Sequence, residues 1–266
     1  MLKLKVLVFS GYGLNSEEET AYGFELAGAS VDIVHVNDLI DAVADLNNYQ
    51  ILAFPGGFAF GDDTGAGNAY GYTVRNHLWE KLLDFISHDR LIIGICNGFQ
   101  ILVNLGLLPA LKMKYGEREA ALLANSGARY LNRWTDLRVE HDSPWLHGIS
   151  ELSLPIAHGE GRFYAAESVR NELRRKKRIA LKYTKGATST YLDLPANPNG
   201  ALDNIAGITD ETGRIFGLMP HPDRALFFTQ LPDWPLQKEL LLRQGKPLSH
   251  FGPGLAIFQN AQRYFS

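Results

Sequence analysis

Residues 91–100, which read LIIGICNGFQ, determine the fold that we expect for this chain. The first five are apolar and rich in β-branched side chains, a composition typical of a buried strand. Gly94, Cys96 and Gly98 form the pattern Gly-x-Cys-x-Gly, and the residues from Asn97 onward favour a helix. A strand that turns sharply into a helix at a nucleophilic residue is the nucleophile elbow of α/β enzymes. The stretch therefore predicts an α/β protein with Cys96 at the end of a strand.

The rest of the first half alternates short apolar strands with longer helical segments. Ser16 and Glu19 form a capping-box pattern that starts one helix, and a second helix is expected over residues 69–86. The strands expected beside them span residues 5–9, 31–36 and 50–54. This alternation implies an open, mostly parallel sheet with helices on both faces.

The second half has a different pattern, in which turns rather than helices separate the strands. We expect these strands to be antiparallel additions to the same sheet, followed by a helix over residues 253–264. No Pro/Ser-rich linker divides the chain, which favours a single domain over residues 1–266. The expected strands span residues 129–131, 134–139, 179–183, 205–209 and 215–219.

Composition and charge argue against several classes of function. The 266 residues include 26 Lys plus Arg and 29 Asp plus Glu, and the net charge of −3 gives no field that would attract nucleic acid or an anionic membrane. The basic cluster at residues 170–178 lacks interleaved aromatic residues, so we interpret it as a solvated helix face. No apolar run suits a signal sequence or a membrane span, and the single cysteine allows no intramolecular disulfide. We therefore expect a cytoplasmic protein.

The glycine-rich stretch at residues 56–67, GGFAFGDDTGAG, does not fit a phosphate-binding loop. It lacks the Gly-Lys-Ser/Thr ending of a P-loop and does not match GxGxxG between a strand and a helix. The lone Cys96 also excludes a thiolate metal cluster within one chain. We therefore expect no cofactor and no metal in this chain.

Cys96 is the candidate nucleophile, with His221 as its base. The elbow lifts the Cys96 side chain above the sheet edge, and the helix N-terminus behind it favours the thiolate. A buried, inert cysteine is the alternative, but glycines flank Cys96 on both sides, which favours the catalytic interpretation. His221 follows an expected strand in GLMPHPDR, and active sites of open α/β sheets lie at the carboxyl ends of their strands. Asp223, two residues further on, is placed to orient the imidazole.

An acyl-transfer nucleophile also needs hydrogen-bond donors for the oxyanion that develops during attack. One candidate is the backbone N–H of Gly57, in the turn Pro55-Gly56-Gly57 after the third expected strand. The other is the backbone N–H of Asn97, directly after the nucleophile. Taken alone, the Pro-Gly-Gly sequence would be an ordinary turn.

These segments, in this order, resemble the class I, or triad, glutamine amidotransferases. Further motifs make the chain similar to the glutaminase components of phosphoribosylformylglycinamidine synthases, over nearly its whole length from about Lys5 to Tyr264. The motifs are residues 58–62, CNGFQ at 96–100, AHGEGRF at 157–163, PANPNG at 195–200 and MPHPDR at 219–224.

The resemblance implies a mechanism and a partner. Cys96 would attack the side-chain carboxamide of glutamine, and His221 and Asp223 would complete the triad. The ammonia would pass to an ATP-dependent synthetase subunit that makes formylglycinamidine ribonucleotide in de novo purine biosynthesis. ATP and Mg would then bind only to the synthetase, and the need for a small bridging subunit stays open.

One residue departs from the family pattern, because the family usually has glutamate where this chain has Asp223. Aspartate serves in Ser-His-Asp triads, so we keep Asp223 in the triad. Two alternatives stay open: a non-catalytic assembly subunit of the same complex, and another Cys-elbow α/β hydrolase, although those place histidine where this chain has Asn97. Residues expected to shape the glutamine pocket or the synthetase interface are Phe58, Gln100, His158, Glu160 and Arg162.

Overall fold

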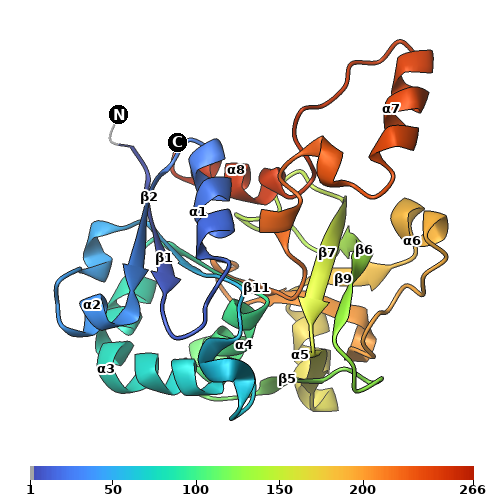
Figure 1. The fold of residues 1–266 in the computed structure, drawn as a ribbon. Helices are drawn as coiled ribbons and strands as arrows, with labels where there is room; N and C mark the ends of the chain where they lie inside the picture. The colour runs from blue at the N-terminus through green and yellow to red at the C-terminus, as the bar shows by residue number, and fades with distance from the viewer. Residues whose placement is uncertain (1–2) are drawn as a thin grey trace.

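The computed structural model describes residues 3–266, and in this part of the chain a nine-stranded sheet runs through the molecule (Figure 1). Five neighbouring strands are parallel, and four antiparallel strands extend the sheet on one side. The expected α/β fold, with antiparallel additions from the second half of the chain, is confirmed. The strand order is β2 (Ser30–His35), β1 (Lys5–Ser10), β3 (Ile51–Phe54), β4 (Leu91–Ile95), β11 (Ile215–Leu218), β10 (Ile205–Thr209), β9 (Ile179–Thr184), β6 (Leu131–Val139) and β7 (Glu151–His158).

Helices cover the parallel part of the sheet. α1 packs against α8, with the rings of Phe24 and Phe258 4.8 Å apart, and α3 packs against α4. Right-handed crossovers place these two pairs on opposite faces, because the chain steps in opposite directions along the sheet after β1 and after β3. The helices are α1 (Glu17–Leu26), α2 (Val36–Ile40), α3 (Asn68–Ser87), α4 (Asn97–Asn104), α5 (Glu167–Arg175), α6 (Ala187–Tyr191), α7 (Trp234–Arg243) and α8 (Leu255–Tyr264).

Every residue of β3, β4 and β11 is buried, because helices cover both faces of these central strands. The buried apolar side chains form one contiguous cluster that reaches from Leu4 to Ala261. This packing makes the carboxyl ends of the central strands a rigid base for the loops that follow them.

Three strands that the sequence analysis did not predict lie in the second half. β5 (Ala120–Ala124) pairs with β8 (Glu160–Ala165) in a separate two-stranded sheet, and β7 is an edge strand of the main sheet. Pro155 lies within β7, and proline is tolerated there because an edge strand needs ladder hydrogen bonds on one side only. The segments expected as separate strands at 129–131 and 134–139 are in fact one strand, β6.

Two local expectations need correction or refinement. α1 begins directly after Ser16 as predicted, but the Ser16 side chain makes no capping hydrogen bond and instead accepts one from Arg224 at 3.1 Å. The basic cluster lies partly on α5, where Arg170 and Arg174 pair with Asp203.

Within residues 3–266, no helix has the length and apolar character to cross a membrane.

Candidate active site

Three neighbouring parallel strands, β3, β4 and β11, end at the same edge of the sheet. Gly57 follows β3, Cys96 follows β4 and His221 follows β11. The segments are far apart in the sequence, and the strand order alone brings them side by side. In Figure 1 the arrows of β1 and β7 point downward to this edge.

The backbone at Cys96 has the strained geometry of a nucleophile elbow. Its φ of 52° and ψ of −106° lie outside the regions that most residues adopt, and α4 begins at the next residue. A Cβ at Gly98 would lie only 1.8 Å from the carbonyl oxygen of Phe54, and a Cβ at Gly94 would lie 2.6 Å from the backbone of Gly98. The two glycines therefore allow α4 to start against β3, with the thiol at the sheet edge.

His221 and Asp223 form a buried pair beside the thiol. Nδ1 of His221 lies 3.2 Å from Oδ1 of Asp223, and the backbone N–H of His221 donates to the carbonyl of Pro155 at 2.8 Å. A Cβ at Gly56 would lie 2.7 Å from Cε1 of the imidazole, so only glycine fits there. The imidazole is thus held from several sides, and its Nε2 has no hydrogen-bonded nitrogen or oxygen partner among the described residues.

Charge determines the protonation state of this imidazole. Burial lowers the pKa of His221, but the neighbouring charges of Asp223 and Cys96, and the hydrogen bond to Asp223, raise it to about 9. These charges therefore favour the protonated form of His221.

The side chain of Asn97 ties the loop after β3 to the nucleophile helix. Its Oδ1 accepts the backbone N–H of Ala59 at 3.1 Å, and its Nδ2 donates to Asp62 at 3.2 Å and to Gln100 at 2.8 Å. Gly57 lies in the same loop, close to the backbone of residues 13–15. These contacts fix the two backbone segments that carry the expected oxyanion donors.

The end of β7 completes the site. The Cys96 thiol donates to the carbonyl oxygen of Ala157, with 3.6 Å between sulfur and oxygen. Next to it, His158 is buried and its Nδ1 hydrogen-bonds to Asn125 at 3.0 Å. Burial and the nearby charge of His221 lower the pKa of His158 to about 3, so this second imidazole is neutral.

Comparison with known proteins identifies the family. Residues 3–265 match the family model of the CobB/CobQ-like glutamine amidotransferase domain. The phosphoribosylformylglycinamidine synthase subunit PurQ of Methanococcus maripaludis is 48% identical over 98% of this chain and 97% of its own. The chain belongs to the PurQ family of glutamine amidotransferases. The PurQ subunit of Dehalococcoides mccartyi is 43% identical over 99% of this chain and 98% of its own.

Solved structures agree with the assignment to the PurQ family. In the structure of PurLQS from Thermotoga maritima, one chain matches with a TM-score of 0.71 and 28% identity over the full length of both chains. A glutamine amidotransferase from the same organism shares the fold, with a TM-score of 0.51, 14% identity and coverage of 99% of this chain and 92% of the other. The PurQ assignment sets aside the alternative of another Cys-elbow hydrolase.

In this PurQ-family chain, Gln100 and Glu160 lie together, one turn of α4 away from the nucleophile. The Gln100 amide donates to the backbone carbonyl of Glu160, and the Glu160 carboxylate accepts the N–H of Ala66 at 3.0 Å. Both residues line a polar pocket of about 240 Å³. Burial, followed by the charge of Glu160, raises the pKa of Asp62 to about 6. The Arg162 side chain donates to the carbonyl of Ala124 at 3.0 Å.

Two residues near the site were not expected from the sequence. The ring of Tyr130 lies 6.1 Å from that of Phe58, which is 42% exposed, and burial, followed by the nearby Cys96, raises the pKa of the Tyr130 hydroxyl. Asn125 is the other addition. Its only sequence signal is an asparagine shortly before the strand expected at residues 129–131, which predicts a turn at most.

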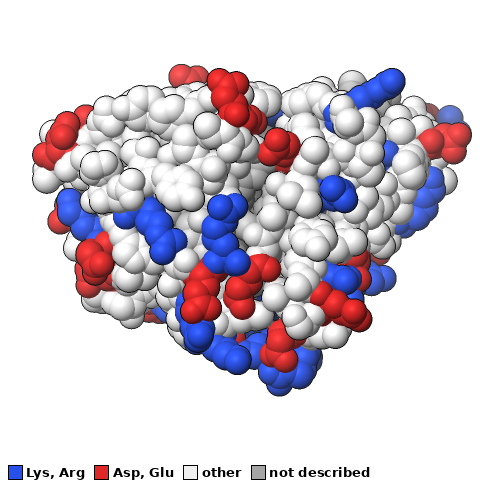
Figure 2. Space-filling view, turned by 90° about the horizontal axis from the view of Figure 1, so that it is seen from below, with Lys and Arg blue, Asp and Glu red and all other residues white. Residues whose placement is uncertain are grey.

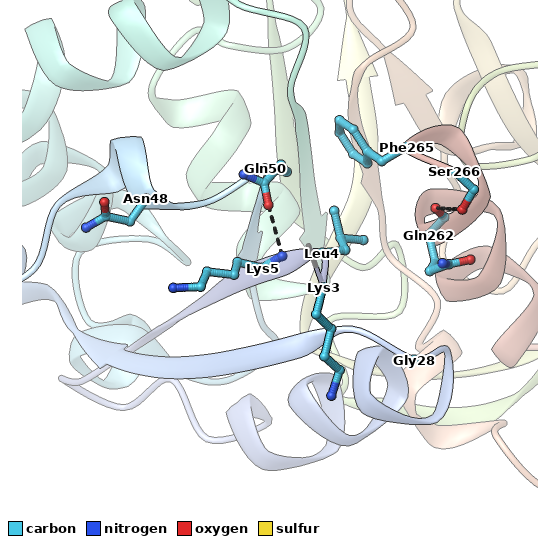
Figure 3. A pocket seen from close by; sticks show the side chains of 9 residues that line it. All are labelled: Lys3, Leu4, Lys5, Gly28, Asn48, Gln50, Gln262, Phe265 and Ser266. Atoms are coloured by element: carbon cyan, nitrogen blue, oxygen red, sulfur yellow. Dashed lines mark hydrogen bonds between the residues drawn. The ribbon is translucent and has the colours of Figure 1, made fainter. Parts of the chain in front are cut away.

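Another pocket lies away from the PurQ catalytic residues. A pocket of about 750 Å³ lies at the opposite edge of the sheet, where Lys5 begins β1 and Gln50 precedes β3 (Figure 3). The backbone N–H of Lys5 donates to the Gln50 side chain there at 2.9 Å, and the chain ends at Ser266 on the rim. In the part of the chain that the structure describes, no group of three or more His, Cys, Asp or Glu residues could hold a metal ion.

Proposed function

We propose that this PurQ-family chain is the glutaminase component of a phosphoribosylformylglycinamidine synthase and that Cys96, His221 and Asp223 form its catalytic triad. The observation that carries the proposal is the buried His221–Asp223 pair beside a cysteine with strained elbow geometry. Strain at a functional residue is kept only where the surrounding structure enforces it. Here the close packing of Gly94, Gly98 and Phe54 enforces it.

The reaction begins when the Cys96 sulfur attacks the carboxamide carbon of glutamine and His221 holds the thiol proton. The carbonyl oxygen becomes an oxyanion, which the N–H groups of Gly57 and Asn97 stabilise. The C–N bond then breaks, His221 gives its proton to the leaving nitrogen, and ammonia departs from a γ-glutamyl thioester. His221 next removes a proton from water, which attacks the thioester and releases glutamate and the free thiol.

Asp223 holds the imidazole and balances its charge. The Asp223 carboxylate accepts a hydrogen bond from Nδ1–H of His221, so Nε2 is the nitrogen that faces the thiol. The same carboxylate contributes to the raised pKa of His221. An imidazole that exchanges a proton with sulfur, nitrogen and water in turn needs this fixed orientation.

The ammonia is used by a synthetase partner. Relatives of this chain are subunits of phosphoribosylformylglycinamidine synthase, and one structural relative occurs in PurLQS. We propose the corresponding ATP-dependent synthetase, together with a small bridging subunit, as the partners here, with ATP and Mg bound on the synthetase. Figure 2 shows the face at the catalytic edge with uncharged surface over much of its upper part and with Lys, Arg, Asp and Glu side chains across its middle and lower part. Such a mixture of uncharged and charged surface suits docking to another subunit. Exposed aromatic residues follow the strand ends at Tyr12, Phe58 and Phe60.

Two further parts of the proposal concern the chain as a whole. We propose that residues 1–266 form one glutaminase domain, because the buried apolar residues make one contiguous cluster. We also propose the cytoplasm as its location, since a free nucleophilic cysteine works only where thiols stay reduced.

The test compares two nitrogen sources in the complex assembled with the synthetase. Cys96→Ala should abolish product formation with glutamine and leave product formation with ammonia near the wild-type rate, because only the glutaminase step needs the thiol. If Cys96→Ala retains activity with glutamine, Cys96 is not the nucleophile, and the alternative of a non-catalytic assembly subunit gains support. Loss of the ammonia-dependent activity as well would contradict the division of labour between the two subunits.

A further inference from the structure

The outer edge of β7 holds both reacting side chains through its backbone. Pro155 and Ala157 are two residues apart, so their carbonyl groups point to the same side of the strand. The Pro155 oxygen accepts the backbone N–H of His221 at 2.8 Å, and the Ala157 oxygen accepts the thiol of Cys96 at 3.6 Å. Within residues 3–266, β7 is the last strand of the sheet, so no further strand there competes for these two acceptors.

Asn125 fixes the turn that follows β7. Its Nδ2 donates to the carbonyls of His158 and Arg129, both at 2.8 Å. Its Oδ1 accepts the N–H of Gly161 at 3.2 Å and lies 3.0 Å from Nδ1 of His158. All four bonds come from one side chain that is 3% exposed. The carbonyl of Ala157, one residue before His158, therefore has little freedom to move.

The same hydrogen bonds determine the tautomer of His158. Both donors of the Asn125 amide are used on carbonyl groups, so its oxygen accepts and Nδ1 of His158 must carry the proton. Nε2 of His158 is then a bare lone pair, buried and without a partner among the described residues. Burial and the charge of His221 keep this imidazole neutral. The end of β7 thus offers acceptors, and no positive charge, beside the thiol.

We propose that the carbonyl oxygen of Ala157 accepts a hydrogen bond from the carboxamide nitrogen of bound glutamine, and that Asn125 is the positioning residue for this contact. This inference rests on the proposed glutaminase function. A carboxamide has two N–H donors on its nitrogen, and its oxygen faces the donors of Gly57 and Asn97. When Cys96 attacks as the thiolate, its sulfur no longer donates a hydrogen bond to the Ala157 oxygen. That oxygen is then free to accept the N–H that the substrate brings.

This contact makes the site selective for an amide. A carboxylate or an ester has an oxygen in place of the N–H₂ group, and that oxygen would face the Ala157 carbonyl without a proton between them. A site that leaves a buried polar group unpaired with the wrong substrate discriminates strongly against it. The product glutamate, which carries a carboxylate at this position, is disfavoured in the same way, and this promotes its release.

The test uses two substrates that differ only in the leaving group, L-glutamine and L-glutamate γ-methyl ester, with the chain assembled with its synthetase. Asn125→Ala should lower the ratio of kcat/KM for glutamine to kcat/KM for the ester by about tenfold or more, because only glutamine uses the Ala157 contact. Asn125→Asp keeps the two acceptor bonds and serves as a second variant if the alanine variant does not fold. It should lower the ratio in the same direction.

Asn197→Ala is the matched control. The Asn197 side chain also makes four hydrogen bonds, but all of them are to residues 199–204 and none is to β7 or to its following turn. It should leave the substrate ratio unchanged. Equal losses of kcat/KM on glutamine and on the ester in both Asn125 variants would overturn the inference, since that result is what a purely structural residue gives. A wild-type complex that hydrolyses neither substrate would instead contradict the proposed glutaminase function.

Discussion

Nδ1 of His221 lies 3.2 Å from Oδ1 of Asp223, although only Pro222 separates the two residues in the chain. The residues after His221 form a short 3₁₀ turn, which brings both side chains to the same side. Both residues are almost completely buried. The turn explains how an aspartate reaches the imidazole at a position where the family usually has the longer glutamate.

This geometry predicts that replacing His221 and replacing Asp223 lower kcat by different factors. His221→Ala removes the group that moves protons and should lower kcat with glutamine by about 10³-fold. Asp223→Ala leaves the base in place but removes its orientation and its counter-charge, and should lower kcat by a smaller factor. Steady-state glutaminase assays of the assembled complex measure both values. Equal losses in the two variants would show that Asp223 does more than orient the base.

The raised pKa of His221 predicts a pH-dependent stability. The folded chain holds a proton on His221 up to about pH 9, whereas the unfolded chain releases it near the ordinary value of 6.5. The stabilisation is therefore complete below about pH 6.5 and is lost as the pH rises through 9, with an upper limit of about 3 kcal/mol.

Urea unfolding of the wild type and of His221→Gln, followed between about pH 6 and pH 9.5, measures this effect. The free energy of unfolding should fall more steeply with rising pH in the wild type than in the variant. Parallel curves for the two proteins would mean that the folded and unfolded states bind this proton equally well.

The close approach of α4 to β3 predicts a severe effect of one added methyl group. A Cβ at Gly98 would lie 1.8 Å from the Phe54 carbonyl oxygen, so Gly98→Ala must push the helix away from the strand. We expect a loss of about 3 kcal/mol or more in the free energy of unfolding. Gly127→Ala is the control, because nothing lies within 4 Å of a Cβ there, and its thermal melting should match the wild type. Similar melting of both variants would contradict the packing described for the elbow.

The carboxyl group of Asp62 predicts a gain in stability on substitution. Its pKa of about 6 means that ionisation in the folded state is disfavoured, first by burial and then by Glu160. Asp62→Asn keeps an acceptor for Asn97 and removes the charge. Because Asp62 is partly exposed, we expect a gain of only about 1 kcal/mol at pH 8, and a smaller one at pH 4.5, where Asp62 is protonated in the wild type. Thermal melting of the wild type and of Asp62→Asn at the two pH values measures the gain in stability. A larger gain at pH 4.5 than at pH 8 would refute the prediction.

The parallel strands and the positions of Cys96 and His221 were predictable because local patterns encode them. A short apolar run followed by a glycine-flanked cysteine specifies strand, turn and helix within ten residues. The carboxyl edge of a parallel sheet then brings the segments after β3, β4 and β11 together whatever the distance between them in the chain.

The end of β7 was not predictable because its role depends on contacts between distant segments. Cys96 and Ala157 are 61 positions apart, and Asn125 and His158 are 33 apart. A proline within the strand also obscures the strand pattern. At Ser16 the local pattern predicted too much. The capping pattern correctly predicts where α1 begins, but the hydrogen-bond partner of the Ser16 hydroxyl is Arg224, which tertiary packing brings to it.

Capture of the covalent intermediate tests the account most directly. The complex is quenched in acid during turnover of glutamine, digested with protease and analysed by mass spectrometry. The account predicts one γ-glutamyl group on the peptide that contains Cys96, and none in a parallel digest of Cys96→Ala. Two results would contradict Cys96 as the nucleophile. One is a Cys96 peptide without this group although glutamate is being produced, and the other is a γ-glutamyl group on another residue.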